Sequence, residues 1–418
     1  MEGHADPVVP VLLGLVVLFV AAKVGGIFAG RLNQPAVLGE LVFGILLGNL
    51  RIFGFRALDF IAQEEIFTIL AGIGVVLLLF EVGLESSISE LLGVGSVSAV
   101  VAVIGVVVPF ALGCGVSYLF QPDKSLYIHA FVGATLCATS VGITARVFKD
   151  LGKLQTKEAR IILGAAVIDD VLGLIILAVI SGVIASVAAG HGSDDFSLMS
   201  MLWIAVKAIG FLVVSILVGG RIAPALFRFG ARLKMEGMLL SLSLSFCFFL
   251  AWLASQVGLA PIVGAFAAGL IIDGAGFPKF FGHDEPSLEH LIFPLSKFFV
   301  PVFFVHMGMQ VDLTTFSELS AILFGLALSF MAILGKQLCG FGIFGAENRG
   351  VDRLTIGIGM VPRGEVGLIF AVIGAGLSLD GRPVIDKPLY SAIVLMVMVT
   401  TMLTPPGLTW SLNRARRG

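Results

Sequence analysis

Thirteen apolar stretches follow one another along the 418 residues, with short polar connections between them. They cover approximately residues 8–30, 34–50, 66–84, 91–120, 126–145, 161–187, 199–220, 236–255, 258–273, 288–311, 319–345, 354–378 and 389–409. A helix of about 20 apolar residues crosses a bilayer core of ~30 Å, whereas a transmembrane β-barrel shows alternating segments of about ten residues. The pattern therefore predicts an all-α membrane protein with thirteen transmembrane helices.

The composition excludes several classes of soluble protein. Hydrophobic residues make up 58% of the chain and charged residues 13%, against roughly 25% charged in a soluble domain. No basic domain is present, so we expect no nucleic-acid partner, and no catalytic motif lies outside the spans, so we expect no enzyme activity. Lipid is the expected surrounding, and no cofactor is implied.

The lysines and arginines set the predicted orientation. If connections alternate between the two sides, sixteen of the 26 basic residues fall on the side that holds the C-terminus, five fall on the other side, and five lie within spans. Basic residues gather on the cytoplasmic side of membrane proteins. We therefore expect a multi-pass protein with its N-terminus outside and its C-terminus in the cytoplasm.

The two halves of the chain resemble each other at an offset of 225 residues. Residues 80–85 (FEVGLE) match 305–310 (VHMGMQ), and residues 140–143 (SVGI) match 365–368 (EVGL). Matching spans are seven apart in order, and because seven is odd the halves enter the membrane from opposite sides. Inverted repeats are typical of secondary transporters, which bind their substrate near the bilayer midplane.

Two adjacent aspartates, Asp169 and Asp170, lie in a stretch of residues 161–189 that holds no other charge. An ionised carboxylate at this depth costs at least ~2.5–3.5 kcal/mol, so acidic residues within a span indicate a functional site. At ~1.5 Å per helical residue, Asp169 is about 13 Å from the cytoplasmic edge. The pair predicts an ion or proton site, although a purely structural polar pair is the alternative.

Other polar residues fall at a similar depth. By the same rise per residue, Lys336 lies about 16 Å in, Arg363 and Glu365 about 15–18 Å in, and Thr139 and Ser140 about 9–10 Å in. Opposite charges at one level offset part of the cost of leaving water. Lys336 is therefore either a titrating partner or a structural counter-charge, and Arg363 and Glu365 are structural or gating residues rather than ligands.

The twelfth span is interrupted by Pro362 and by the glycines at positions 357, 359, 364 and 367. Proline lacks the backbone donor of a helix, and broken helices at membrane depth line cavities and bind ions with their half-helix ends. The matching fifth span, around residues 137–142, contains no proline. Its break is expected from the repeat alone, with Thr139 and Ser140 at the break.

Three runs resemble the second family of monovalent cation:proton antiporters, and in particular its NapA-like bacterial sodium/proton members. They are residues 138–146 (ATSVGITAR), 164–170 (GAAVIDD) and 362–367 (PRGEVG). The paired aspartates, followed downstream by Gly335 and Lys336, are a fairly specific feature of the family. Potassium-efflux members of that family carry glutamine in place of the first aspartate. The resemblance extends over nearly the whole chain and implies an NhaA-like antiporter fold in a bacterial inner membrane.

The resemblance also implies a role for each site residue. Asp170 would be the main Na+ and proton ligand, with Asp169 paired to Lys336. Thr139 and Ser140 would lie where the two broken helices cross, and Arg363 and Glu365 would neutralise the crossing.

The same resemblance implies a division into domains and a homodimer. Residues 8–90 and 236–312 would form a dimerisation domain, residues 91–190 and 317–412 a moving ion-translocation core, and residues 199–235 a linker helix.

The function expected from these residues is exchange of Na+, and also Li+, for H+ by alternating access. Cation and protons would compete for Asp170, and a proton on Lys336 would make the exchange electrogenic. K+/H+ or mixed Na+/K+ exchange is the alternative, because a carboxylate with carbonyl ligands does not report ionic radius. Sodium-coupled uptake of an organic anion and an ion channel are weaker alternatives.

Overall fold

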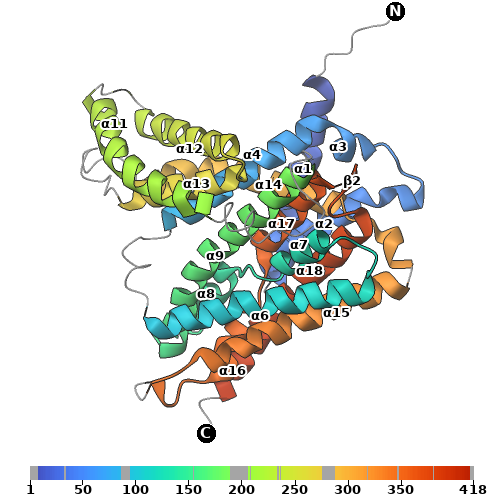
Figure 1. The fold of residues 1–418 in the computed structure, drawn as a ribbon. Coiled ribbons are helices and arrows are strands. Elements are labelled where there is room, and N and C mark those ends of the chain that lie inside the picture. Colours follow the sequence, from blue (N-terminus) through green and yellow to red (C-terminus); the bar gives the residue numbers. More distant parts are fainter. Residues whose placement is uncertain are drawn as a thin grey trace, which may run out of the picture.

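The computed structural model describes residues 8–32, 34–85, 95–153, 155–188, 206–207, 209–232, 235, 237–274, 288–317, 319–345, 348–379 and 381–414. These residues are almost entirely helical (Figure 1). Ten described helices are long and apolar enough to cross a bilayer, and three shorter apolar helices accompany them. The expected all-α, polytopic membrane class is confirmed.

The elements follow one another as α1 (Val8–Arg31), α2 (Ala36–Gly48), η1 (Leu50–Phe53), α3 (Asp59–Gln63), α4 (Glu65–Glu85), α6 (Ser96–Phe120), α7 (Leu126–Thr135), α8 (Val141–Asp150), α9 (Lys157–Ala188), the π-helical turn η2 (Ser215–Gly219), α11 (Gly220–Arg232), α12 (Met238–Gln256), α13 (Pro261–Gly274), α14 (Leu288–Met309), η4 (Leu313–Ser317), α15 (Leu319–Gln337), η5 (Leu338–Gly342), α16 (Arg353–Gly359), α17 (Gly364–Gly376), β1 (Ser378–Leu379), β2 (Arg382–Pro383) and α18 (Lys387–Arg414). The antiparallel pair β1–β2 and the short helix α3 were not expected from the sequence.

Both expected helix breaks are present. The fifth apolar stretch divides into α7 and α8, and the twelfth divides into α16 and α17. The second break follows from Pro362 and from Gly364, whose φ of +41° suits a residue without a Cβ. No proline explains the first break, so tertiary contacts hold it open.

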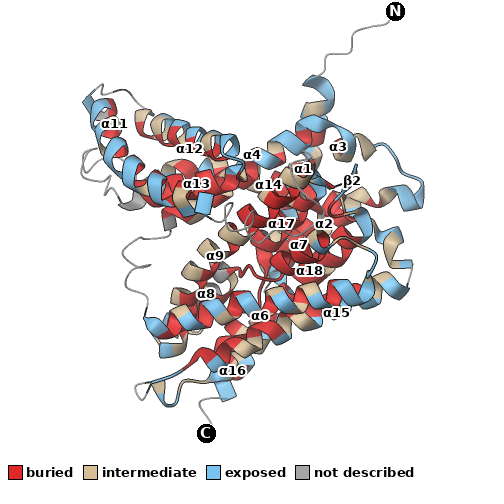
Figure 2. Ribbon diagram, viewed as in Figure 1, coloured by how far each residue is buried: buried red, intermediate tan, exposed pale blue. Residues whose placement is uncertain are grey.

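The helices pack in two groups. In one group α2 and α14 pack together, α4 packs on α13 and α14, and α12 packs on α13; in the other, α6 packs on α7, α9 and α15, and α18 on α15, α16 and α17. Figure 2 shows buried residues concentrated where the helices of each group meet, around α13 and around α7, α17 and α18. The outer faces of helices such as α1 carry exposed Leu, Val and Phe residues, as expected of surfaces that contact lipid.

The internal repeat appears in the packing. Gly44 of α2 meets Gly308 of α14 so closely that a Cβ on either would collide with the other helix, and Gly83 of α4 meets Gly269 of α13 in the same way. Adding 225 to 44 and to 83 gives 269 and 308. The two glycine crossings are therefore equivalent under the sequence offset, and small residues let these helix backbones approach.

Candidate functional site

Asp169 and Lys336 form an ion pair inside the second group of helices. Lys336 Nζ of α15 donates a hydrogen bond to Asp169 Oδ1 of α9 over 2.9 Å, and both side chains are 0% exposed. Opposite charges in contact offset much of the cost of burying each one, whereas removal of either would leave an uncompensated charge. The sequence placed these two residues at one depth, and the structure places them in contact.

The second aspartate faces different surroundings. Asp169 is fully buried, while Asp170 is only partly buried. Adjacent positions on a helix point about 100° apart, so one carboxylate is directed at Lys336 while the other is directed elsewhere. The two aspartates therefore have different surroundings, and their different roles stay a prediction.

The two broken helices cross beside this pair. Ser140 N donates to the carbonyl of Pro362 over 2.7 Å, and the Thr139 hydroxyl donates to the carbonyl of Met360 over 3.4 Å. Both side chains are buried. Thr139 and Ser140 therefore lie at the crossing, as expected, and connect the chain between α7 and α8 to the chain between α16 and α17.

Arg363 holds the crossing together. Its guanidinium donates to the carbonyl of Ala138 over 3.0 Å and to the carbonyl of Ala332 on α15 over 3.1 Å, and the side chain is fully buried. Residue 363 is residue 138 plus the repeat offset of 225, so at this point a residue contacts its own counterpart. Such a contact is expected at the axis that relates two repeats. The geometry supports a structural role for Arg363.

The site includes residues that the sequence analysis did not single out. The Thr144 hydroxyl donates to the carbonyl of Gly359 over 2.6 Å and adds a contact between α8 and α16. Gly105 of α6 faces the ion pair together with Cys339 of η5. A threonine and a glycine in an apolar span carry little signal, because both are common in packed membrane helices.

Glu365 lies in the first turn of α17, and its side chain is outside what the structure describes. Its expected role at the crossing stays a prediction. Asp169 Oδ2 is buried and accepts no hydrogen bond from the described residues. A buried carboxylate oxygen with this geometry is able to accept a proton or contact a cation.

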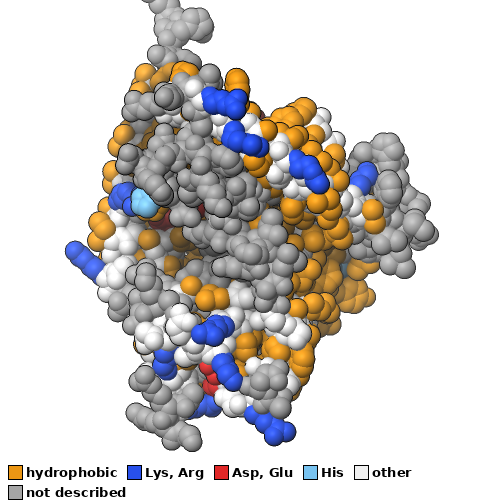
Figure 3. Space-filling view, turned by 90° about the vertical axis from the view of Figure 1, so that its left-hand side faces the viewer, with side chains coloured by type: hydrophobic (Ala, Val, Ile, Leu, Met, Phe, Trp, Pro, Cys, Tyr) orange, Lys and Arg blue, Asp and Glu red, His pale blue; other side chains and the backbone are white. Residues whose placement is uncertain are grey.

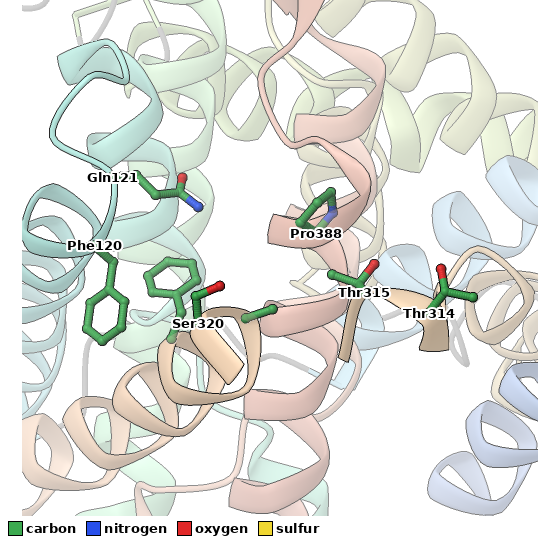
Figure 4. A pocket seen from close by; sticks show the side chains of 8 residues that line it. Phe120, Gln121, Thr314, Thr315, Ser320 and Pro388 are labelled. Carbon is green, nitrogen blue, oxygen red and sulfur yellow. The ribbon is translucent and has the colours of Figure 1, made fainter. Parts of the chain in front are cut away.

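A pocket elsewhere in the molecule is not part of this site. It has a volume of about 360 Å³ and lies where α6 ends and where α15 and α18 begin. Figure 4 shows Gln121 and Ser320 directed into it beside Pro388. None of its lining residues is one of the predicted site residues, so the aspartates rather than this pocket mark the candidate ion site.

Comparison with known proteins gives a consistent picture. The family described as "Sodium/hydrogen exchanger, transmembrane" matches residues 15–414. The chain is 38% identical to the high-affinity Na+/H+ antiporter NhaS3 of Synechocystis, with 95% of this chain and 89% of the relative covered. It is 36% identical to the Na+/H+-K+ antiporter GerN of Bacillus cereus, with 95% of each covered, and 32% identical to a Na+/H+ antiporter of Enterococcus hirae, with 94% and 95% covered.

Among solved structures, the sodium proton antiporter MjNhaP1 of Methanocaldococcus jannaschii has a similar fold. The TM-score is 0.70 at 19% sequence identity, and the alignment covers 99% of this chain and 98% of that one. At this identity the likeness concerns the fold alone. It extends over both groups of helices and both broken helices.

Proposed function

The chain belongs to the sodium/hydrogen exchanger family, and on that premise we propose that it exchanges Na+ for H+ across a membrane by alternating access. The observation that carries the proposal is the fully buried Asp169–Lys336 pair beside the partly buried Asp170, at the crossing of two broken helices. A cation transporter needs carboxylate and carbonyl oxygens where water is excluded, and this crossing supplies both.

In this proposal Asp170 is the residue for which Na+ and protons compete. Na+ is a hard cation and prefers oxygen ligands, and a carboxylate binds either the cation or a proton. Thr139 and Ser140 supply further oxygens next to the crossing. A protonated Asp170 carries H+ in one direction and a Na+-bound Asp170 carries the cation in the other.

Lys336 is the proposed second proton carrier. It keeps its proton while Asp169 faces it, and rearrangement at Asp170 on Na+ binding would weaken the neighbouring pair. Release of that proton would give two protons for each Na+ and an electrogenic exchange. The support is the 2.9 Å contact of two groups that are both shielded from water.

The finer architecture is also part of the proposal. The crossings would number thirteen, in inverted six-helix repeats of the NhaA-like type, with the N-terminus outside and the C-terminus in the cytoplasm of a bacterial cell. The group of α1, α2, α4, α12, α13 and α14 would form the dimerisation domain of a homodimer. The group of α6 to α9 and α15 to α18 would form the moving core, with the chain around η2 and α11 as linker.

Figure 3 shows the face at which the left-hand ends of α6 and α15 in Figure 1 lie. Lysines and arginines are spread over this face, and apolar side chains gather along its right-hand part. Basic residues lie at the ends of membrane spans, so we assign this face to one end of the spans.

Asp170→Asn tests the proposal. The amide matches the carboxylate in shape but carries no charge and does not titrate, so we expect purified variant in proteoliposomes to lose at least about 90% of its Na+-driven pH change. The exposed residue Asp123 provides a matched control, since Asp123→Asn removes a carboxylate outside the site and should transport like the wild type. Wild-type rates in a well-folded Asp170→Asn variant would refute the assignment.

The same assay separates Na+ from K+. The relative GerN is described as a Na+/H+-K+ antiporter, which keeps K+ as a second candidate cation. Replacing Na+ by Li+, K+ or Rb+ should support exchange with Li+ and give little with K+ or Rb+. A pH change as large with K+ as with Na+ would favour mixed exchange.

A further inference from the structure

Where α6 passes the ion pair, its residue is Gly105, which has no side chain. A Cβ on Gly105 of α6 would lie 3.0 Å from Cys339 Sγ, 3.3 Å from Lys336 Nζ and 3.7 Å from Asp169 Oδ1. The first two distances are shorter than ordinary van der Waals contact. A side chain at residue 105 would therefore require the Lys336 ammonium or the Cys339 thiol to shift by a few tenths of an ångström.

The helices around Gly105 are unable to move apart easily. One turn earlier, Val101 of α6 packs directly on Gly342 of η5, where a Cβ would lie 3.0–3.1 Å from Val101 atoms. One turn later, Pro109 of α6 packs on Gly335 of α15 at a comparable 2.9–3.2 Å. Because α6 is held on both sides of Gly105, a side chain added there has to displace Cys339 or Lys336 rather than the helix.

We propose that Gly105 is a positioning residue for ion exchange, because its missing side chain lets Lys336 reach Asp169. The inference rests on the proposed function, and it gives α6 a part in it. Gly105 touches neither cation nor proton; it acts through the distance between the ammonium and the carboxylate.

The charged and titratable groups around Lys336 determine the consequence. The described groups that act on one another here are Asp169 on α9, Arg363 before α17, Cys339 on η5 and Cys137 between α7 and α8. Arg363 is positive, so Asp169 is the described charged group in contact with the Lys336 ammonium that stabilises it. Moving the ammonium away from Asp169 weakens the attraction between the two charges, so exchange that depends on this pair should respond differently to pH.

Gly105→Ala tests the inference in the full-length protein. In proteoliposomes, we expect the pH profile of Na+-driven exchange to shift measurably from that of the wild type, because the ammonium no longer lies at its wild-type distance from Asp169. Gly115 of the same helix provides the control, because a Cβ there meets nothing within 4 Å. Gly115→Ala removes the same glycine flexibility from α6 and should keep the wild-type profile.

A background variant distinguishes positioning from a general packing defect. In Lys336→Ala the group that the new methyl displaces is absent, so adding Gly105→Ala should not shift the profile further. An equal shift with and without Lys336 would overturn the inference, as would a Gly105→Ala profile that superimposes on those of the wild type and Gly115→Ala.

Should Gly105→Ala alone fail to fold, Cys339→Ala supplies room for the methyl group at its shortest contact. The methyl would still lie 3.3 Å from Lys336 Nζ, so the double variant should shift relative to Cys339→Ala alone, and identical profiles would overturn the inference. A wild-type protein without Na+-driven exchange would instead refute the proposed function. The two failures are therefore distinguishable.

Discussion

At the level of single residues, burial separates two neighbours of the same chemistry. Asp169 is fully buried against Lys336, and Asp170 is partly buried. The sequence identified both aspartates because charges in an apolar span are costly. It also placed Lys336 at a similar depth, but depth does not determine which aspartate pairs with the lysine. Contact is a property of how α9 and α15 pack.

Removing Lys336 should have two separable effects. Lys336→Ala leaves Asp169 buried without a counter-charge, which typically costs about 3–5 kcal/mol of stability. We expect a lower melting temperature in detergent and, if folded protein is recovered, exchange that no longer responds to membrane voltage. Lys387→Ala, at an exposed position at the start of α18, should change neither property. Exchange that still responds to membrane voltage in Lys336→Ala would show that Lys336 does not carry a transported proton.

At the level of elements, the two breaks have different origins. Pro362 and Gly364 interrupt the twelfth apolar stretch and were visible in the sequence. The break between α7 and α8 has no proline, and it is held by hydrogen bonds from Ser140, Thr144 and Arg363 across the crossing. Such a break could be inferred only from its counterpart in the repeat.

Gly364→Ala should weaken the crossing. Gly364 has a φ of +41°, and a Cβ there would collide with the side chain of Ser140 at 2.5 Å. A non-glycine residue in this backbone region costs of order 1–3 kcal/mol before the collision is counted. We therefore expect a lower melting temperature and slower exchange. Gly376→Ala at the other end of α17, where a Cβ meets nothing within 4 Å, is the matched control. Equal stability of the two variants would contradict this account.

At the level of the whole molecule, polar contacts join the two groups of helices where α14 leads toward α15. Arg51 pairs with Asp312 over 3.0 Å, and the Asn49 side chain donates to the carbonyl of Val311 over 2.8 Å. Asp312 N in turn donates to the Ser391 hydroxyl of α18 over 3.2 Å. The connection is therefore tied to α2 and η1 on one side and to α18 on the other.

The pH dependence of this connection follows from Asp312. Burial alone would raise the pKa of the Asp312 carboxyl, but hydrogen bonds from Thr314 and the nearby Arg51 guanidinium outweigh it and lower the pKa. The charged Asp312 carboxylate stabilises the folded protein fully above the unfolded-state pKa of an aspartate, about 3.9. This stabilisation is lost as the pH falls through the lower pKa of Asp312 in the folded state.

Asp312→Asn should therefore melt at a lower temperature than the wild type at pH 7, by the equivalent of up to about 1 kcal/mol. Protonation of Asp312 removes this stabilisation from the wild type in acid. The melting temperatures of the wild type and the variant should therefore converge as the pH falls below about 4. Melting temperatures measured in detergent across this range provide the check. A constant difference at all pH values would show that the carboxylate charge is not the cause.

The sequence by itself determined the membrane class, the repeat at an offset of 225 residues and the aspartates of the site. These follow from local properties: the apolar length of a span, the cost of a buried charge and the spacing of matching residues. It missed Gly105 and Thr144, because a glycine or threonine in a span has no distinctive local signature. It also missed α3 and the β1–β2 pair.

The family resemblance implied the pairing of Asp169 with Lys336, and the structure shows the two side chains in contact. Only the tertiary structure decided that Arg363 contacts its own repeat counterpart at Ala138 and that Gly105 lies against the ion pair. Each of these is a contact between helices far apart in the sequence. Spacing along one helix gives depth and direction, but the distance between two helices depends on how their side chains interlock across the whole core.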